Sequence, residues 1–272
     1  MYTYDHFTQE QVCGVFTPWH FVALAVFTIA MVIAIDRAKR LNEKQIWWLM
    51  FAIAVLVTVE EIIKIALRLS KGEGLYAWVP LYFCSLFIYA IWFALCKNKF
   101  IKNMGNSFLV CGGIVASLCY TIYPTTSLLS LPIWHPASLH GLSFHWLMCF
   151  TGILLYVKGI YRPKKKDFVY YLSFTTLFTV ITYIINICCG VNLMFINWPY
   201  EVPILQKIYD AWHFGYTLLV YLAQSVALFW AFYGFDQLVQ KRSKKSAQEE
   251  VVNNEQNSWK GVFYWHWANL KL

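Results

Sequence analysis

Long apolar runs alternate with short polar connections along most of this chain. A helix that crosses the hydrocarbon core of a bilayer needs roughly 17–25 predominantly apolar residues. Seven segments meet this requirement, and Pro or Gly stands at several of their ends, as is typical of helix ends and turns. They run near Pro18–Ile35, Gln45–Leu69, Ala77–Cys96, Met104–Ile122, Ser138–Val157, Phe168–Gly190 and Tyr209–Gly234. The pattern predicts an all-α, polytopic membrane protein, with a bundle of seven transmembrane helices in residues 1–235.

The composition supports lipid as the solvent for much of this surface. Hydrophobic residues make up 59% of the 272 residues and charged residues 13%, against roughly 45–50% and 25% in soluble domains. A net charge of +8 would suggest nucleic acid as the partner of a soluble protein. Here the basic residues fall between the apolar runs, so we expect the lipid bilayer of the cell membrane, and no nucleic acid, as the partner.

The distribution of basic residues predicts the orientation of the helices. Most of the 22 Lys and Arg residues lie in alternate connections, near residues 37–44, 97–102 and 158–166, and after residue 235. Cytoplasmic connections carry an excess of Lys and Arg. We therefore expect the amino terminus outside and residues 236–272 as a polar cytoplasmic tail. Its aromatic end is expected either at the membrane interface or in an ordinary flexible tail.

Polar residues inside the apolar segments gather near their predicted outer ends. Such groups are costly in a membrane, so their placement is informative. At about 1.5 Å per residue, each lies at a depth of about 10 Å or less, or in the outer half of its helix. They are His20, Glu60, Glu61, Lys64, Cys84, His140, His145, Asn186, Asn192 and His213. Their shared depth predicts a water-accessible cavity that opens to the outer leaflet.

Each of these groups also has a structural interpretation. Glu60 and Lys64 are four residues apart on a helix and can pair directly. A cysteine in an apolar helix is usually structural, but a nearby base at the same depth favours a reactive thiol. Cys84 and His145 form such a pair. His140 lies about 140° around the helix from His145, which disfavours a shared metal ion. We expect no metal and no cofactor.

At these residues the chain resembles a known family. PLYFCSLFIYAIW, at residues 80–92, resembles the proline–leucine–aromatic–cysteine signature of the YwaF-like bacterial membrane proteins, which are related to the animal transmembrane-protein-164 acyltransferases. SLHGLSFHWLMC resembles the histidine helix of that family, with His145 at the main histidine and His140 at an accompanying one. TPWHFVALAV resembles the first helix, with His20 in the matching place. GVNLMFINWP resembles a glycine–asparagine–aromatic–methionine stretch, with Leu193 where an aromatic residue is usual.

The resemblance implies an acyltransferase that acts on membrane phospholipids through a thioester acyl-enzyme. Cys84 would be the nucleophile and His145 its base. Donors to the developing carbonyl oxyanion would come from the group His140, Asn186 and Asn192. Headgroup binding is expected from the group Glu60, Glu61, Lys64 and His20. Water as the acceptor would make the same site a hydrolase.

Two alternatives belong to other classes of protein. A small-solute binding or transport protein would use the same cavity, with Glu60, Glu61 and Lys64 as its binding or coupling residues and Cys84 as an incidental thiol. A membrane scaffold would tolerate substitution of all these side chains. The scaffold interpretation gives no reason for polar groups at one depth.

Overall fold

The structure, a computed structural model, describes residues 11–70, 72, 74, 79–124, 127–199 and 203–245. All regular elements within these residues are helices, so the predicted all-α class is confirmed. The chain forms two compact units, Met1–Trp230 and Ala231–Leu272. The described part of the second unit, residues 231–245, is helical. The predicted domain boundary at residue 235 stays a prediction.

Six helical segments are long and apolar enough to cross a membrane. They are Pro18–Ala38, Glu43–Leu69, Lys99–Ile122, Pro136–Val157, Lys165–Cys189 and His213–Lys245. These correspond to six of the seven segments expected from the sequence. The prediction of a multi-pass membrane protein is confirmed, whereas the orientation across the membrane stays a prediction.

The third predicted segment, Ala77–Cys96, is not a single helix in the structure. It contains α3, Leu86–Leu95, and the preceding residues 79–85 are not helical. Ten residues of helix extend about 15 Å, which is half of a hydrocarbon core. Pro80 explains why no helix passes through residues 79 and 80, because its ring and missing N–H disfavour helix there and at the residue before it. The count of seven transmembrane helices therefore stays a prediction.

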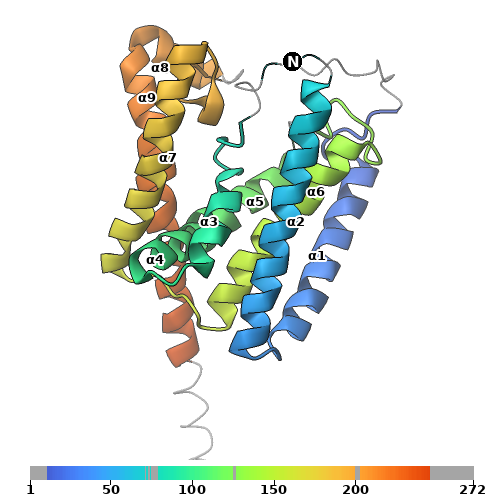
Figure 1. Ribbon diagram of the computed structural model, residues 1–272, viewed down its shortest axis with the longest axis vertical. Coiled ribbons are helices and arrows are strands. Elements are labelled where there is room, and N and C mark those ends of the chain that lie inside the picture. Colours follow the sequence, from blue (N-terminus) through green and yellow to red (C-terminus); the bar gives the residue numbers. More distant parts are fainter. Residues whose placement is uncertain are drawn as a thin grey trace, which may run out of the picture. The chain divides into compact units, whose positions relative to one another are not determined.

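The span Lys99–Ile122 lies at the centre of the first unit, since it is the most buried of the six. It consists of α4 (Lys99–Ser107), η2 (Phe108–Gly113, a π-helical segment) and α5 (Ile114–Ile122). All six residues of η2 are buried, and η2 contacts α3, α6 (Pro136–Val157) and α7 (Phe168–Cys189). Figure 1 shows α3, α4 and α5 in the middle of the unit, with α7 on one side of them. The span begins five residues before the predicted Met104, because Asn98 caps α4 by accepting hydrogen bonds from the N–H groups of Phe100 and Ile101.

The ends of other spans also follow from local sequence. In α2 (Glu43–Leu69), Asn42 and Gln45 form a reciprocal capping box. α6 has Pro136 at its start, and the His135 ring accepts a hydrogen bond from the Ala137 N–H. α7 ends at Gly190, whose φ of 64° is the left-handed conformation that glycine adopts freely.

The last span does not begin where the sequence predicts. The predicted start at Tyr209 falls in α8, Pro203–Ala211, and Trp212 leaves helical geometry at φ −161°. The long helix then begins with α9, His213–Leu222, passes through η5, Ala223–Ala227, and continues to residue 245. The first residues of the predicted tail, 236–245, are thus helical. The aromatic end lies outside the described residues.

Two glycines let neighbouring backbones approach closely at the core. A Cβ at Gly105 of α4 would lie 2.3 Å from the Ala90 carbonyl oxygen of α3. A Cβ at Gly152 of α6 would lie 2.4 Å from the Leu109 carbonyl oxygen of η2. Small residues at helix interfaces permit this approach in membrane proteins. The positions of α3 and α6 therefore depend on these two glycines.

We predict that Gly105→Ala lowers the free energy of unfolding of the detergent-solubilised protein by about 1–3 kcal/mol, as is usual for overpacked cores. Its melting temperature should fall accordingly. The added methyl group would meet two backbone atoms of α3, which cannot rotate away. Gly234→Ala is the matched control, since a Cβ there meets nothing within 4 Å. Equal melting temperatures for the two variants would contradict the close approach of α3 and α4.

Candidate functional site

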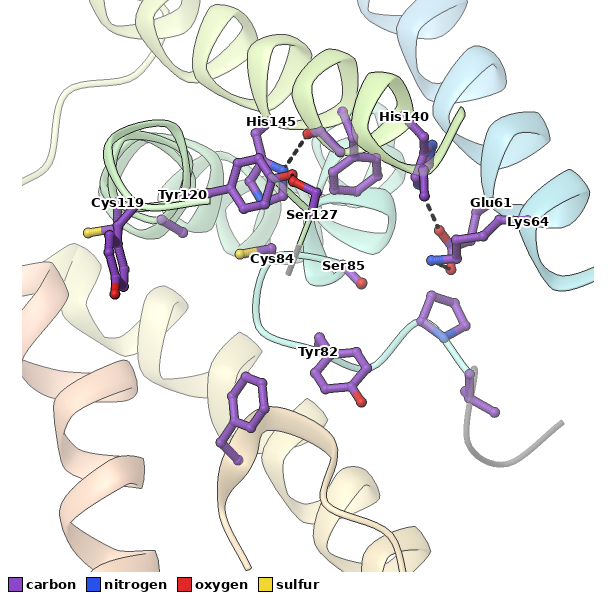
Figure 2. A pocket seen from close by; sticks show the side chains of 18 residues that line it. Glu61, Lys64, Tyr82, Cys84, Ser85, Cys119, Tyr120, Ser127, His140 and His145 are labelled. Carbon is purple, nitrogen blue, oxygen red and sulfur yellow. Dashed lines mark hydrogen bonds and ion pairs between the residues drawn. The ribbon is translucent and has the colours of Figure 1, made fainter. Parts of the chain in front are cut away.

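One cavity of about 650 Å³ lies in the first unit. This volume is within the range of small-molecule binding sites. Its walls come from α2, the segment 79–85, α5, α6 and Phe195. Its polar lining includes the residues labelled in Figure 2, namely Glu61, Lys64, Tyr82, Cys84, Ser85, Cys119, Tyr120, Ser127, His140 and His145. The structure therefore brings together five of the residues singled out from the sequence: Glu61, Lys64, Cys84, His140 and His145.

Cys84 lies in the non-helical segment, just before α3. Its thiol is free and half-buried. The first hydrogen bonds of the helix run from the Leu86 N–H to the carbonyls of Tyr82 and Phe83. Cys84 thus stands at the amino end of α3, beside backbone N–H groups that have no acceptor within the helix.

His145 offers a basic nitrogen to the same cavity. Its side chain is 8% exposed, and Nδ1 lies 2.7 Å from the Gly141 carbonyl oxygen. A carbonyl only accepts hydrogen bonds, so Nδ1 carries the proton and the neutral ring has its lone pair on Nε2. Nε2 is buried and has no hydrogen-bond partner among the described residues. Buried polar atoms are nearly always bonded, so Nε2 marks a position for a ligand or a reacting proton.

Tyr120 fixes the plane of the His145 ring. The two rings are parallel within 6°, with centroids 3.6 Å apart. The Tyr120 hydroxyl shares a 2.7 Å hydrogen bond with the Ser127 hydroxyl. Gly141 leaves the space for this arrangement, because a Cβ there would lie 2.1 Å from the Tyr120 oxygen. Stacking and the Gly141 hydrogen bond together hold the imidazole in one orientation.

A charged cluster forms another part of the wall. Glu61 and Lys64 of α2 form an ion pair, and the Glu61 side chain is 4% exposed. His140 of α6 lies with Nδ1 3.5 Å from Glu60 and Nε2 3.9 Å from Glu61. The structure thus pairs Lys64 with Glu61 rather than with Glu60, the partner that the sequence suggested. Glu60 does not line the cavity but contacts His140 behind it.

His20 has a structural position instead of the expected place at a headgroup. It is 1% exposed and does not line the cavity. Its Nδ1 accepts a hydrogen bond from the Phe16 N–H, and its Nε2 donates to the Thr121 carbonyl. Both ring nitrogens are therefore occupied, and the side chain ties the start of α1 (Pro18–Ala38) to the end of α5.

Asn186 and Asn192 shape a loop and do not line the cavity. The Asn186 amide exchanges two hydrogen bonds with the backbone of Leu193, at 2.8 and 3.0 Å. The Asn192 amide donates to the Trp198 carbonyl and accepts from the Asn197 N–H. These contacts account for both side chains without a role as oxyanion donors.

Several residues of the site were not singled out from the sequence. Tyr120, Ser127 and Phe195 carry no signal of their own, because their contacts depend on how each helix or loop is rotated. Gly141 did carry a signal, since a glycine in a helix interior costs about 1 kcal/mol relative to alanine and so suggests a close neighbour.

Among the described residues, no group of three His, Cys, Asp or Glu side chains converges in the way that a metal ion requires.

We predict that Gly141→Ala destabilises the protein and that Tyr120→Leu partly restores its stability in the same chain. The methyl group would collide with the Tyr120 hydroxyl, and the shorter side chain removes that collision. A double-mutant cycle of melting temperatures measures the coupling, which is about 0.5–3 kcal/mol for residues in contact. Strictly additive effects would show that the two side chains do not meet.

Comparison with known proteins places the chain in a family. Residues 15–235 match the model of the TMEM164 family, and this range includes every residue that lines the cavity. No curated protein and no solved structure matches the chain. The chain belongs to the TMEM164 family, a membrane protein family associated with acyltransferase activity.

Proposed function

We propose that this protein transfers acyl chains of membrane phospholipids through a thioester on Cys84. The observation that carries the proposal is the unpartnered Nε2 of His145, a residue that lines the same cavity as Cys84. A thiol needs a nearby base to become a nucleophile. No hydrogen bond joins His145 Nε2 to the Cys84 thiol in the structure, and catalytic hydrogen bonds often tighten only in the substrate complex.

Transfer takes place in two steps, acylation of Cys84 and then transfer of the acyl chain to an acceptor. His145 Nε2 takes the thiol proton, and the Cys84 sulfur attacks the ester carbonyl carbon of the phospholipid. The carbon–oxygen ester bond breaks, the lyso-lipid oxygen takes the proton from His145, and the acyl chain remains on sulfur. An acceptor hydroxyl or amine then gives its proton to His145 and attacks the thioester, and the carbon–sulfur bond breaks. The thiolate recovers its proton from His145. Water in place of the acceptor gives hydrolysis.

Backbone groups at the start of α3 are the best donors for the oxyanion. The first N–H groups of a helix have no acceptor within the helix, and those of Cys84 and Ser85 precede the first helical hydrogen bonds. An acyl group on the Cys84 sulfur would lie beside them. Preorganised backbone donors of this kind commonly stabilise tetrahedral intermediates. We propose them in place of Asn186 and Asn192.

The charged cluster is suited to a phospholipid headgroup. Lys64 offers a positive charge to a phosphate, and its ion pair with Glu61 holds that charge in place. Because Glu61 is almost fully buried, its ion pair is protected from screening by solvent. The headgroup would bind at this cluster, with the ester linkage beside Cys84.

We further propose seven membrane crossings, with the segment 79–85 and α3 together forming the third. The basic connections support an outer amino terminus and a cavity that opens to the outer leaflet. The motif at residues 80–92 supports membership of the YwaF-like bacterial branch.

Solute binding or transport is the second candidate, and the charged cluster is the observation that favours it. Charged residues within transmembrane segments often mark solute or ion pathways. In that case Glu61 and Lys64 would be essential and Cys84 would be dispensable. The two candidates therefore differ in which substitutions abolish activity.

We predict that the purified protein forms a hydroxylamine-sensitive acyl adduct with a phospholipid that carries an alkyne-tagged acyl chain. Cys84→Ser abolishes the thioester because the sulfur is lost. His145→Ala slows adduct formation by about 10²–10⁴-fold, the usual contribution of a general base. The adduct is measured by coupling the alkyne to a fluorophore and resolving the protein on a gel.

Cys119→Ser is the matched control for this experiment. Cys119 lines the same cavity and is the more exposed thiol, so a general reaction of cavity thiols would depend on it. Retention of the adduct in Cys119→Ser, with its loss in Cys84→Ser, supports the proposal. Retention in Cys84→Ser would contradict it.

We predict that the double substitution Glu61→Gln, Lys64→Met weakens reaction with phospholipid but not with a p-nitrophenyl ester. Replacing both partners avoids leaving one buried charge unpaired. The apparent KM for phospholipid should rise about tenfold or more, corresponding to a lost charge-assisted contact of about 1.5–3 kcal/mol. Equal losses with both esters would argue against headgroup binding at this cluster.

A further inference from the structure

We propose that Phe195 determines which acyl chains the cavity accepts, as part of an aromatic wall that it forms with Tyr82. This inference rests on the proposed acyl transfer at Cys84. It adds a specificity-determining residue from a loop that the catalytic steps do not use.

The loop that carries Phe195 has an unusual backbone. Met194 and Phe195 both have φ of 56°, in the left-handed region that residues other than glycine rarely adopt. Two consecutive residues in this conformation persist only where the surrounding structure over-determines them. Such strain is commonly found at functional sites.

Hydrogen bonds from neighbouring side chains fix the backbone of residues 193–196. Each of four consecutive backbone carbonyls accepts a hydrogen bond from a side chain of α7, α9 or η5. The donors are Asn186 to the Leu193 carbonyl, Gln224 to Met194, Tyr216 to Phe195 and Thr217 to Ile196, at 3.0, 3.2, 2.6 and 2.7 Å. The backbone conformation is therefore held by side chains of two long helical segments, α7 and the span that begins with α9.

The consequence of this backbone is the direction in which one side chain points. Leu193, Met194 and Ile196 are at most 1% exposed and belong to the core. Phe195 between them is half-buried and lines the cavity. The four hydrogen bonds thus place the Phe195 ring in the cavity wall, while the buried side chains on either side of it pack in the core.

Phe195 meets the segment that carries the nucleophile. Its ring lies 5.5 Å from that of Tyr82, tilted by 44°, and Tyr82 precedes Cys84 by two residues. Figure 2 shows Tyr82 and His145 on opposite sides of Cys84. With the base on one side, an acyl chain on the Cys84 sulfur extends along a wall that includes Tyr82 and Phe195. The size of the aromatic pair would limit the length or bulk of that chain.

The test is the preference of the enzyme among p-nitrophenyl esters of short, medium and long chains. Phe195→Gly is the most informative variant, since glycine adopts a φ of 56° without strain and the ring is removed. We expect the ratio of kcat/KM for the long ester to that for the short ester to rise about tenfold, within the usual range for added methylenes in a pocket. Phe195→Leu should give a smaller change in the same direction.

Trp198→Ala is the matched control. Trp198 is an aromatic residue of the same loop that is 42% exposed and does not line the cavity, so its removal should leave the ratio unchanged. Thermal unfolding of each variant separates folding from specificity. A folded Phe195→Gly or Phe195→Leu protein with the ratio of the wild type would overturn the inference. So would an equal change in Trp198→Ala.

The same assay distinguishes this failure from failure of the proposed function. If the wild type acylates Cys84 but the Phe195 variants keep its chain preference, only the role of Phe195 is wrong. If no ester acylates Cys84 in the wild type, the acyl-transfer proposal falls, and the role of Phe195 falls with it.

Discussion

The constraint on which this structure depends is that lipid offers no hydrogen bonds to the backbone. Non-helical backbone is tolerated at membrane depth only where it is buried in protein or lines a cavity. Residues 79–85 and the loop around residue 195 are two non-helical stretches, and both contribute to the wall of the cavity. In the loop, side chains of neighbouring helices bind four carbonyls in a row. The candidate site therefore combines two departures from helix with walls from α2, α5 and α6.

Close helix packing fixes the remaining walls. Gly105 sets the distance between α4 and α3, the helix that Cys84 precedes, and Gly152 sets α6 against η2. Gly141, one further glycine of α6, lets Tyr120 lie flat against His145. Between apolar helices in lipid, association comes from packing rather than from a hydrophobic driving force. Glycines therefore help to fix the positions of Cys84 and His145.

The sequence predicted the features that depend on composition and on the length of apolar segments. It missed those that depend on the rotation of each helix about its axis and on the path of the backbone. Six spans follow from apolar length alone, and the shared depth of Cys84, His140 and His145 indicated their common cavity. Apolar character concealed the break at Pro80, because hydropathy counts side chains and not backbone hydrogen bonds. The partner of Lys64 was ambiguous because residues three and four positions away on a helix are both its neighbours. Asn186 lies near the end of α7 and Asn192 just after it, but an amide serves a loop as readily as an oxyanion.

The energetics of the loop at Phe195 indicate what its network accomplishes. Two residues in the left-handed region together cost about 2–6 kcal/mol, and four hydrogen bonds from side chains to the backbone return about as much, at a net 0.5–1.5 kcal/mol each. The network therefore compensates the strain and adds little stability of its own. Glycine at residue 195 would remove half of that strain, yet the chain keeps an aromatic ring there. What distinguishes the strained loop from an unstrained one is the presence of that ring in the cavity, against Tyr82 and close to Cys84.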